Sequence, residues 1–307
     1  MGTPLNLPTE TPTSSSARLA FYIGVHKNPQ QFKELVSAIY EPQHHYLLHV
    51  DLRAEGAVHA AAQSLHKAFS NVSILCSRPC FWGHFGQVSV TLDAIRILLS
   101  GEWDYFLNLS GQDFPLVKPQ RICEFLGRHR GTNFIHLIDQ RKDWPDSISR
   151  LTNYYLLLSG RPRRVPLLKR RMAPNLTYYG GSQWFALHRT FCEYVTSDPF
   201  PRRMARRFRF SFCADEAYFQ TVIMNSPFRL SAVNDNLRYI SWRDGGSHPR
   251  ELDMSDFPAL CACNKFYARK LAPGSPLLAR LSARLRTQIE EGTQPERDQG
   301  PGAAPVP

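Results

Sequence analysis

The sequence contains no long apolar segment. A transmembrane helix needs ~18–20 consecutive apolar residues, and no stretch of the 307 residues approaches that length. The N-terminal stretch MGTPLNLPTETPTSSSA is polar and lacks the apolar region of a signal peptide, and Asn6 does not fit the myristoylation pattern. We therefore expect a cytoplasmic protein with neither a signal peptide nor a transmembrane helix.

The motifs that hold many cofactors are also missing. The chain has no GxxxxGK[ST] phosphate loop and no GxGxxG turn. It has no D-x-D pair, with which many sugar-nucleotide transferases hold a divalent metal. Ser110 lacks the G-x-S-x-G context of a nucleophile, and the histidines form no H-E-x-x-H or H-x-H pair, which argues against serine or metal hydrolases. We expect no metal and no other cofactor.

Acidic residues are in the minority. The chain has 26 Asp and Glu against 37 Lys and Arg, and its net charge is +11. Much of the excess lies in residues 161–171 and 201–210. Either run could meet nucleic acid, an anionic membrane surface or an anionic substrate, or simply form a solvated basic face. Because no zinc-finger spacing and no aromatic RNA-binding signature accompany them, nucleic acid is not an expected partner.

The seven cysteines are odd in number and scattered. Cys261 and Cys263 form a C-x-C pair, but no second pair completes a zinc site. The pattern predicts mostly buried, reduced thiols, which are typical of cytosolic proteins, and leaves one or two disulfides open.

The first half of the chain alternates between strands and helices. Apolar strands are predicted at residues 18–25, 46–50, 72–75 and 105–109, with helices at 31–39, 58–69 and 88–99. This alternation predicts an α/β fold with a mostly parallel sheet flanked by helices. The second half is looser, with strands in 180–187 and 237–242 and a last structured stretch that opens at 267–270. Disordered tails are expected at 1–16 and 286–307, around a single domain at 17–285.

The ends of three predicted strands mark a candidate site. His26, Asp51 and residues 110–113 each follow a strand directly. Because ligands bind open α/β sheets at the carboxyl ends of the strands, these residues are expected to line a ligand site.

Two carboxylates precede a predicted helix in FSFCADEAYFQTVI, residues 210–223. The apolar residues Tyr218, Phe219, Val222 and Ile223 share one helical face. Asp215 is a suitable N-cap, and Glu216 would then be the first helical residue, kept ionised by the helix dipole. The pair could be an ordinary helix start, or Glu216 could act as a general base.

A series of motifs occurs in one order along residues 18 to 275. The motifs are AIYEPQHHYLLHVD, WGHFGQVSVTLDAIRILL, WDYFLNLSGQDFPL, YGGSQWFALHR, ADEAYF, GSHPR and YARKL. This series resembles the core-2/I-branching β-1,6-N-acetylglucosaminyltransferase and peptide O-xylosyltransferase family, and especially its bacterial members. YFLNLSGQDFP is its most specific part.

The resemblance implies a GT-A-type glycosyltransferase fold, with a nucleotide-sugar half at 17–135 and an acceptor half at 136–285. It implies inverting transfer from a UDP-sugar to a hydroxyl. By matching motifs, Glu216 is the expected catalytic base, and Arg250 in GSHPR and Lys270 in YARKL are expected to neutralise the diphosphate without a metal. The missing D-x-D pair agrees with this expectation.

The remaining site residues follow from the same comparison. Asp51, in HVD, matches the nucleotide side of the family's site, and we assign His26 to the same side. Trp242 is the expected aromatic residue near the acceptor, and Asp113 is assigned to the acceptor as well. The vertebrate members' anchor, stem and disulfides have no clear counterpart here, so no cysteine pairing is carried over.

Several alternatives stay open at this point. The donor is UDP-GlcNAc or UDP-xylose, and the acceptor is a glycan, a lipid-linked glycan or a protein. The absence of an anchor suggests assembly of a surface polysaccharide, with a basic run resting on the anionic inner face of a membrane beside a lipid-linked acceptor. The competing hypothesis is a non-catalytic carbohydrate- or nucleic-acid-binding protein on the same fold.

Overall fold

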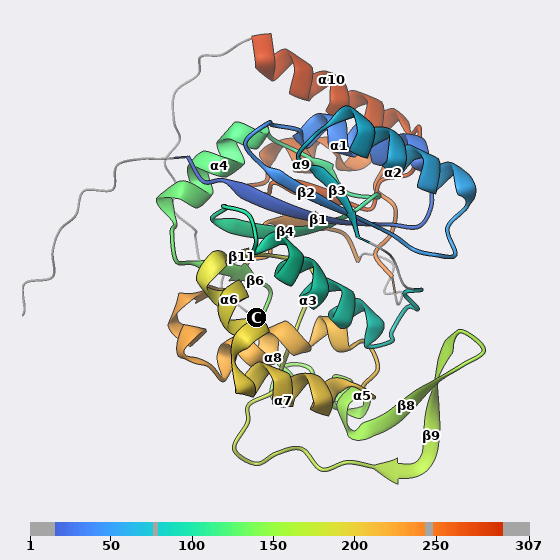
Figure 1. The fold of residues 1–307 in the computed structure, drawn as a ribbon, viewed down its shortest axis with the longest axis vertical. Coiled ribbons are helices and arrows are strands. Elements are labelled where there is room, and N and C mark those ends of the chain that lie inside the picture. Colours follow the sequence, from blue (N-terminus) through green and yellow to red (C-terminus); the bar gives the residue numbers. More distant parts are fainter. Residues whose placement is uncertain (1–15, 76–78, 243–247, 291–307) are drawn as a thin grey trace, which may run out of the picture.

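The computed structural model describes residues 16–75, 79–242 and 248–290, and a seven-stranded sheet forms its centre (Figure 1). The strand order is β12-β6-β11-β4-β1-β2-β3. The strands are β1 (Leu19–Val25), β2 (His45–Val50), β3 (Val72–Leu75), β4 (Tyr105–Ser110), β6 (Asn133–Ile135), β11 (Phe185–His188) and β12 (Ala232–Val233). Only β11 runs antiparallel to its neighbours. The predicted mixed, mostly parallel sheet is therefore confirmed, and it is consistent with a GT-A-type fold.

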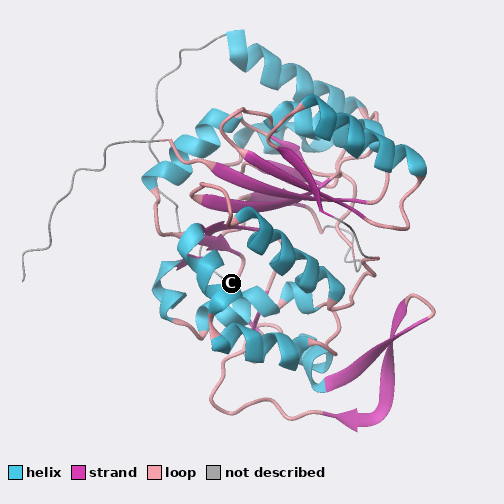
Figure 2. Cartoon of the chain, viewed as in Figure 1, coloured by secondary structure: helices cyan, strands magenta, loops and turns pink. Residues whose placement is uncertain are grey.

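Helices cover both faces of this sheet (Figure 2). One face carries α1 (Pro29–Ile39), α2 (Gly56–Ala68) and α4 (Pro119–Arg128), and the other carries α3 (Gly86–Leu98), α6 (Arg189–Ser197), α7 (Pro199–Phe208) and α8 (Tyr218–Met224). The bounds of α1, α2 and α3 agree with the predicted helices to within about two residues. The short helix α9 (Phe257–Ala262) and the C-terminal α10 (Pro276–Glu290) pack with β5 (Phe114–Pro115) in a third cluster.

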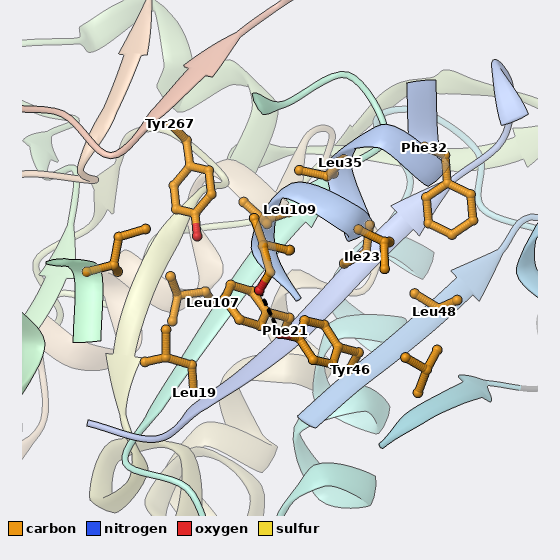
Figure 3. Packing of buried hydrophobic residues seen from close by; sticks show 14 of the residues in the cluster. Leu19, Phe21, Ile23, Phe32, Leu35, Tyr46, Leu48, Leu107, Leu109 and Tyr267 are labelled. Carbon is orange, nitrogen blue, oxygen red and sulfur yellow. Dashed lines mark hydrogen bonds between the residues drawn. The ribbon is translucent and has the colours of Figure 1, made fainter. Parts of the chain in front are cut away.

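The apolar sequence of β1 is explained by burial on both sides. Leu19, Phe21 and Ile23 enter the core beneath α1, whereas Ala20 and Tyr22 enter the core beneath α3. Figure 3 shows the first of these cores, where the β1 side chains meet those of β2, β4 and α1. Each fully buried large apolar side chain contributes about 1.5–3 kcal/mol. This central strand therefore fixes the sheet on which the site is built.

Smaller sheets add the C-terminal motifs to this frame. In one, β14 (Tyr267–Arg269) lies between β13 (Arg238–Ile240) and β5. In another, β10 (Tyr179–Gly180) pairs with β7 (Ile138–Asp139). The three-stranded sheet brings YARKL beside the end of YFLNLSGQDFP, although the two are far apart in sequence.

The first basic run lies in a hairpin that projects from the body (Figures 1 and 2). The hairpin follows the short helix α5 (Ile148–Thr152) and consists of β8 (Asn153–Leu158) and β9 (Arg161–Lys169). The second basic run lies mostly in α7. Periodicity predicted neither element.

The ends of the domain are only partly described. Helix α10 extends through Glu290, beyond the expected start of the C-terminal tail at 286. Residues 1–15 and 291–307 lie outside the described part, as does Cys76. Among the described cysteines, Cys123, Cys192 and Cys213 are buried, Cys80 and Cys263 are partly buried and Cys261 is exposed, so the prediction of mostly buried thiols holds for half of them. Within the described residues, no helix is both long and apolar enough to cross a membrane.

Candidate active site

The carboxyl ends of β1 and β2 bring His26 and Asp51 to one edge of the sheet. Asp51 accepts two hydrogen bonds from the Arg53 guanidinium, at 3.0 and 2.8 Å, and one from the Cys80 backbone N–H at 3.1 Å. Burial raises the pKa of Asp51, but the bonds from Arg53 outweigh it and hold the pKa below its usual value. Asp51 is therefore an ionised, rigidly held acceptor at neutral pH.

Cationic side chains influence His26, which follows β1, and Lys270, which follows β14. Burial, and then Lys27, lower the pKa of His26, so that its imidazole is neutral near pH 7. Burial also lowers the pKa of Lys270, and nearby Arg269 and Lys27 lower it further. An anionic ligand would relieve this repulsion on Lys270. We call Lys27 and Lys270, which follow β1 and β14, the cationic edge, and their charge suits a diphosphate.

Arg250 is placed differently from the other predicted cations. Its guanidinium donates to the Asp256 carboxylate at 2.5 Å, to Ser241 Oγ at 3.0 Å and to the Glu251 carbonyl at 3.0 Å. The Arg250 side chain is only 15% exposed, and that of Asp256 is 0% exposed. These three bonds use three of the five N–H donors of the guanidinium. In this structure Arg250 joins the end of β13 to the 3-10 turn Met254–Asp256.

Asp113 does not reach the surface, which corrects its assignment to the acceptor. Its carboxylate is 0% exposed and accepts hydrogen bonds from Arg269 Nη1 at 3.0 Å and from the Ser110 backbone N–H at 2.6 Å. Arg269 in turn stacks on Trp184, 4.2 Å from the ring centre. A buried carboxylate with both oxygens engaged holds β14 against the end of β4, and it cannot touch an acceptor. Trp242 is exposed, as an acceptor contact requires, and residues 243–247 after it lie outside the described part.

The Asp-Glu pair lies in a turn ahead of the helix, and not at its first residue. Residues Ala214–Glu216 form a 3-10 turn, and α8 begins at Tyr218 with Ala217 as its N-cap. Asp215 caps nothing, and its buried Oδ1 has no hydrogen-bond partner among the described residues. The predicted N-cap, and the argument that the helix dipole keeps Glu216 ionised, are therefore wrong. The physical reason is that Ala217, at φ −143°, leaves the helical conformation between the pair and α8.

An arginine holds Glu216 instead of the dipole. Arg150 Nη1 lies 2.8 Å from Glu216 Oε2, and about a third of each side chain is exposed. Burial raises the pKa of Glu216, and the charge and hydrogen bond of Arg150 oppose that rise. Burial, followed by the charge of Glu216, raises the pKa of Asp215 to about 7. Glu216 is thus a partly exposed carboxylate with a raised pKa, which is what a general base near neutral pH needs.

Two glycines fix the turn that carries Glu216. Gly181 of YGGSQW donates to the Glu216 carbonyl at 2.9 Å, and a Cβ on Gly181 would collide with the His136 carbonyl. On the other side, the Cys213 N–H donates to the Gly83 carbonyl at 2.9 Å. Gly83 has φ +72°, and any Cβ there would enter the Phe212 ring. The family motifs around both glycines therefore meet at this turn.

An exposed tryptophan joins the motifs at the surface. Trp82 contacts the Phe212 ring edge-on, at 5.1 Å between centres, and also His248 of GSHPR, at 5.2 Å. On the inner side, the segment that starts at Gly181 continues to Trp184, on which Arg269 stacks. These contacts connect the Glu216 turn with both the GSHPR segment and the cationic edge.

Sequence reasoning missed Arg150 and Trp82. Arg150 lies 66 residues from Glu216 in sequence, and no local sequence pattern predicts such an ion pair. Trp82 could have been found, because it opens the quoted motif WGHFGQV. Among residues in the described ranges, no group of three or more His, Cys, Asp or Glu could hold a metal ion. Metal independence stays a prediction.

Comparison with known proteins agrees with this arrangement. The family model described as Core-2/I-Branching enzyme matches residues 19–263, and the chain belongs to this family. Xylosyltransferase 1 of Homo sapiens is 31% identical over 236 residues, which cover 75% of this chain and 24% of the human protein. Xylosyltransferase 2 of Canis lupus familiaris is 29% identical over 282 residues, or 82% of this chain and 32% of that protein. These similarities support a glycosyltransferase. The chain spans about a third or less of the length of either relative.

Proposed function

We propose that this protein is an inverting, metal-independent glycosyltransferase that moves a sugar from a UDP-sugar to an acceptor hydroxyl. The observation that carries the proposal is Glu216: a partly exposed carboxylate with a raised pKa, held by Arg150 and by a turn built from family motifs. A carboxylate so placed can accept a proton from an alcohol within hydrogen-bond reach.

The reaction follows as a single displacement. The acceptor oxygen attacks the anomeric carbon and passes its proton to Glu216. At the same time the bond from that carbon to the diphosphate oxygen breaks, and its electron pair stays on the diphosphate oxygen of the leaving UDP. Attack opposite the leaving UDP inverts the anomeric centre. Arg150 orients Glu216, and it limits how far the pKa of that carboxylate rises.

The leaving UDP requires positive charge in place of a metal. Lys27, which follows β1, and Lys270, which follows β14, suit this role because neighbouring positive charges lower the pKa of Lys270 and a bound diphosphate would offset them. Asp51 is an ionised acceptor suited to a hydroxyl or N–H of the nucleotide, and neutral His26 is suited to a hydrogen bond there. Arg250, which Asp256, Ser241 and Glu251 hold in place, is expected to join them as the motif match implies.

The donor is UDP-xylose or UDP-GlcNAc. Relatives named xylosyltransferases favour testing xylose first. The acceptor is a glycan, a lipid-linked glycan or a protein, and we propose a role in surface glycan synthesis with peripheral contact to an anionic membrane. Trp242 and Trp82 are exposed aromatic residues against which an acceptor sugar can stack.

The proposal is tested by UDP release from UDP-xylose and UDP-GlcNAc in EDTA, with UDP binding measured by calorimetry in the same preparation. We expect slow hydrolysis of one donor without metal, and faster release once a suitable acceptor is added. Failure of the protein to bind UDP would overturn the proposal. UDP binding without turnover on any donor or acceptor would favour the non-catalytic carbohydrate-binding alternative.

A further inference from the structure

The β8–β9 hairpin exposes large apolar side chains beside basic ones. Leu158, Leu167 and Leu168 are 57%, 103% and 50% exposed. The basic residues Arg161, Arg163, Arg164 and Lys169 of β9 are exposed as well, and none has an ion-pair partner within the described part of the chain. Water is a poor environment for one fully exposed and two half-exposed leucines, so this surface is suited to an apolar and anionic partner.

A bulge in β9 creates the most exposed point of this surface. Asn153 pairs with Lys169, and Tyr155 pairs with Arg164. Residues 165–168, with the sequence VPLL, therefore bulge out opposite Tyr154 alone. Leu167 adopts a left-handed φ of 63°. For a leucine this conformation is unfavourable, and residues held in such conformations cluster at functional sites.

We propose that the VPLL bulge inserts into the interface of an anionic lipid bilayer, with Arg163, Arg164 and Lys169 against the lipid headgroups. Leucines surrounded by arginine and lysine match the two layers of such an interface, acyl chains below and phosphates above. The hypothesis names the surface that makes the membrane contact proposed above. It does not rest on sugar transfer, because binding to vesicles is measured without donor or acceptor.

The second basic run lacks the apolar half of this pattern. In α7 the large apolar residues Met204 and Phe208 are buried. Arg207 is turned inward, where it donates to Tyr178 Oη at 2.6 Å. Arg202 and Arg206 are exposed, but they have no exposed leucine beside them. Helix α7 therefore offers charge alone, and it supplies a charge-matched control.

The hairpin lies next to the candidate active site at both of its ends. At its root Tyr155 stacks on Phe212, at 5.2 Å between ring centres, and the Phe212 N–H donates to the carbonyl of Arg150, the partner of Glu216. At its turn, Gly160 approaches Phe81 so closely that an added Cβ would lie 3.0 Å from the ring, and Arg53, the partner of Asp51, lies over that ring at 4.2 Å from its centre. A bilayer that holds the bulge would thus keep the Glu216 side of the protein near lipid-linked acceptors.

The test is flotation of the full chain with vesicles of phosphatidylcholine alone or mixed with phosphatidylglycerol. Two double variants remove the two halves of the surface: Leu167→Asp with Leu168→Asp, and Arg163→Gln with Arg164→Gln. The control is Arg202→Gln with Arg206→Gln, which removes the same charge from α7. Thermal unfolding checks the fold, and all three variants are expected to melt like wild type because their side chains are exposed.

We expect wild type and the α7 control to float with anionic vesicles and not with phosphatidylcholine alone. Each basic residue at an anionic surface increases the affinity roughly fivefold. Because the arginine variant lacks two of them, it should bind about 30-fold more weakly. The leucine variant should lose binding at least as strongly. Wild type that floats with neither vesicle, or hairpin variants that bind like wild type, would overturn the proposal. A loss confined to the α7 variant would assign the contact to α7 instead.

Discussion

The ion pair between Arg150 and Glu216 makes a sharp prediction about the pH dependence of activity. Arg150 stabilises the ionised carboxylate, which is the form that acts as a base, and burial opposes it. Replacing Arg150 with Met removes the opposing charge and raises the pKa of Glu216. The basic form is then scarce at low pH and returns as the pH increases.

The size of the effect follows from the exposure of the pair. The two charges lie 2.8 Å apart, and 32% and 30% of their side chains are exposed. Screening by water reduces such a pair to about 1–2 kcal/mol, well below the value for a buried pair. On the acidic side of the optimum, the loss of kcat/KM is therefore expected to be roughly 5- to 30-fold.

The assay is UDP release across a pH series, with Arg150→Lys and Arg96→Met as controls. The lysine variant keeps the charge and should preserve most of the profile, whereas Arg96, an exposed residue of α3 paired with Asp93, should have no effect. A profile of Arg150→Met that coincides with that of wild type would refute the electrostatic role. A loss of equal size at every pH would leave only a role in orienting the carboxylate.

Three further substitutions test the frame and the cationic edge. Gly181→Ala should lower stability by about 1–3 kcal/mol, because the new methyl group meets the His136 carbonyl; an unchanged denaturant midpoint would contradict this contact. Asp113→Ala should lower the free energy of unfolding by about 3–5 kcal/mol, because it leaves Arg269 buried without its carboxylate partner. A decrease below about 1 kcal/mol in the same denaturant titration would show that Arg269 finds another partner. Lys270→Ala should weaken UDP binding roughly tenfold in calorimetry with unchanged thermal stability, and unchanged affinity would remove Lys270 from the diphosphate site.

The parts of the fold that the sequence predicted are those with strong local patterns. Strand β1 was recognisable as an apolar run because both of its faces are buried, and α1 was recognisable as a helix because its apolar residues share one face. The β8–β9 hairpin has no such pattern. Its strands are largely exposed and interrupted by the VPLL bulge, so only its charge was visible.

The candidate site also has parts that the sequence predicted and parts that it could not predict. The family motifs located Glu216 and the residues of the sheet edge, because motifs record positions along the chain. They could not show that Asp113 is fully buried by Arg269, or that Arg250 already binds Asp256, since both facts depend on contacts made by folding. The N-cap prediction failed because Asp215 lies within a 3-10 turn that Ala217 separates from helix α8, and side-chain periodicity does not distinguish such a turn from the start of a helix.

The central claim, that Glu216 is the base, is tested most directly by Glu216→Gln beside Glu102→Gln. The Glu102 side chain is 81% exposed and lies just before the N-terminal end of β4, whereas Ser110 lies at the C-terminal end of that strand, on the side of the candidate site. Glu102→Gln therefore controls for the removal of one carboxylate. Both variants should bind UDP like wild type. We predict that Glu216→Gln lowers the rate of acceptor-dependent UDP release by roughly 10²- to 10⁴-fold, whereas Glu102→Gln keeps the wild-type rate. A Glu216→Gln enzyme that releases UDP at the wild-type rate would contradict the account.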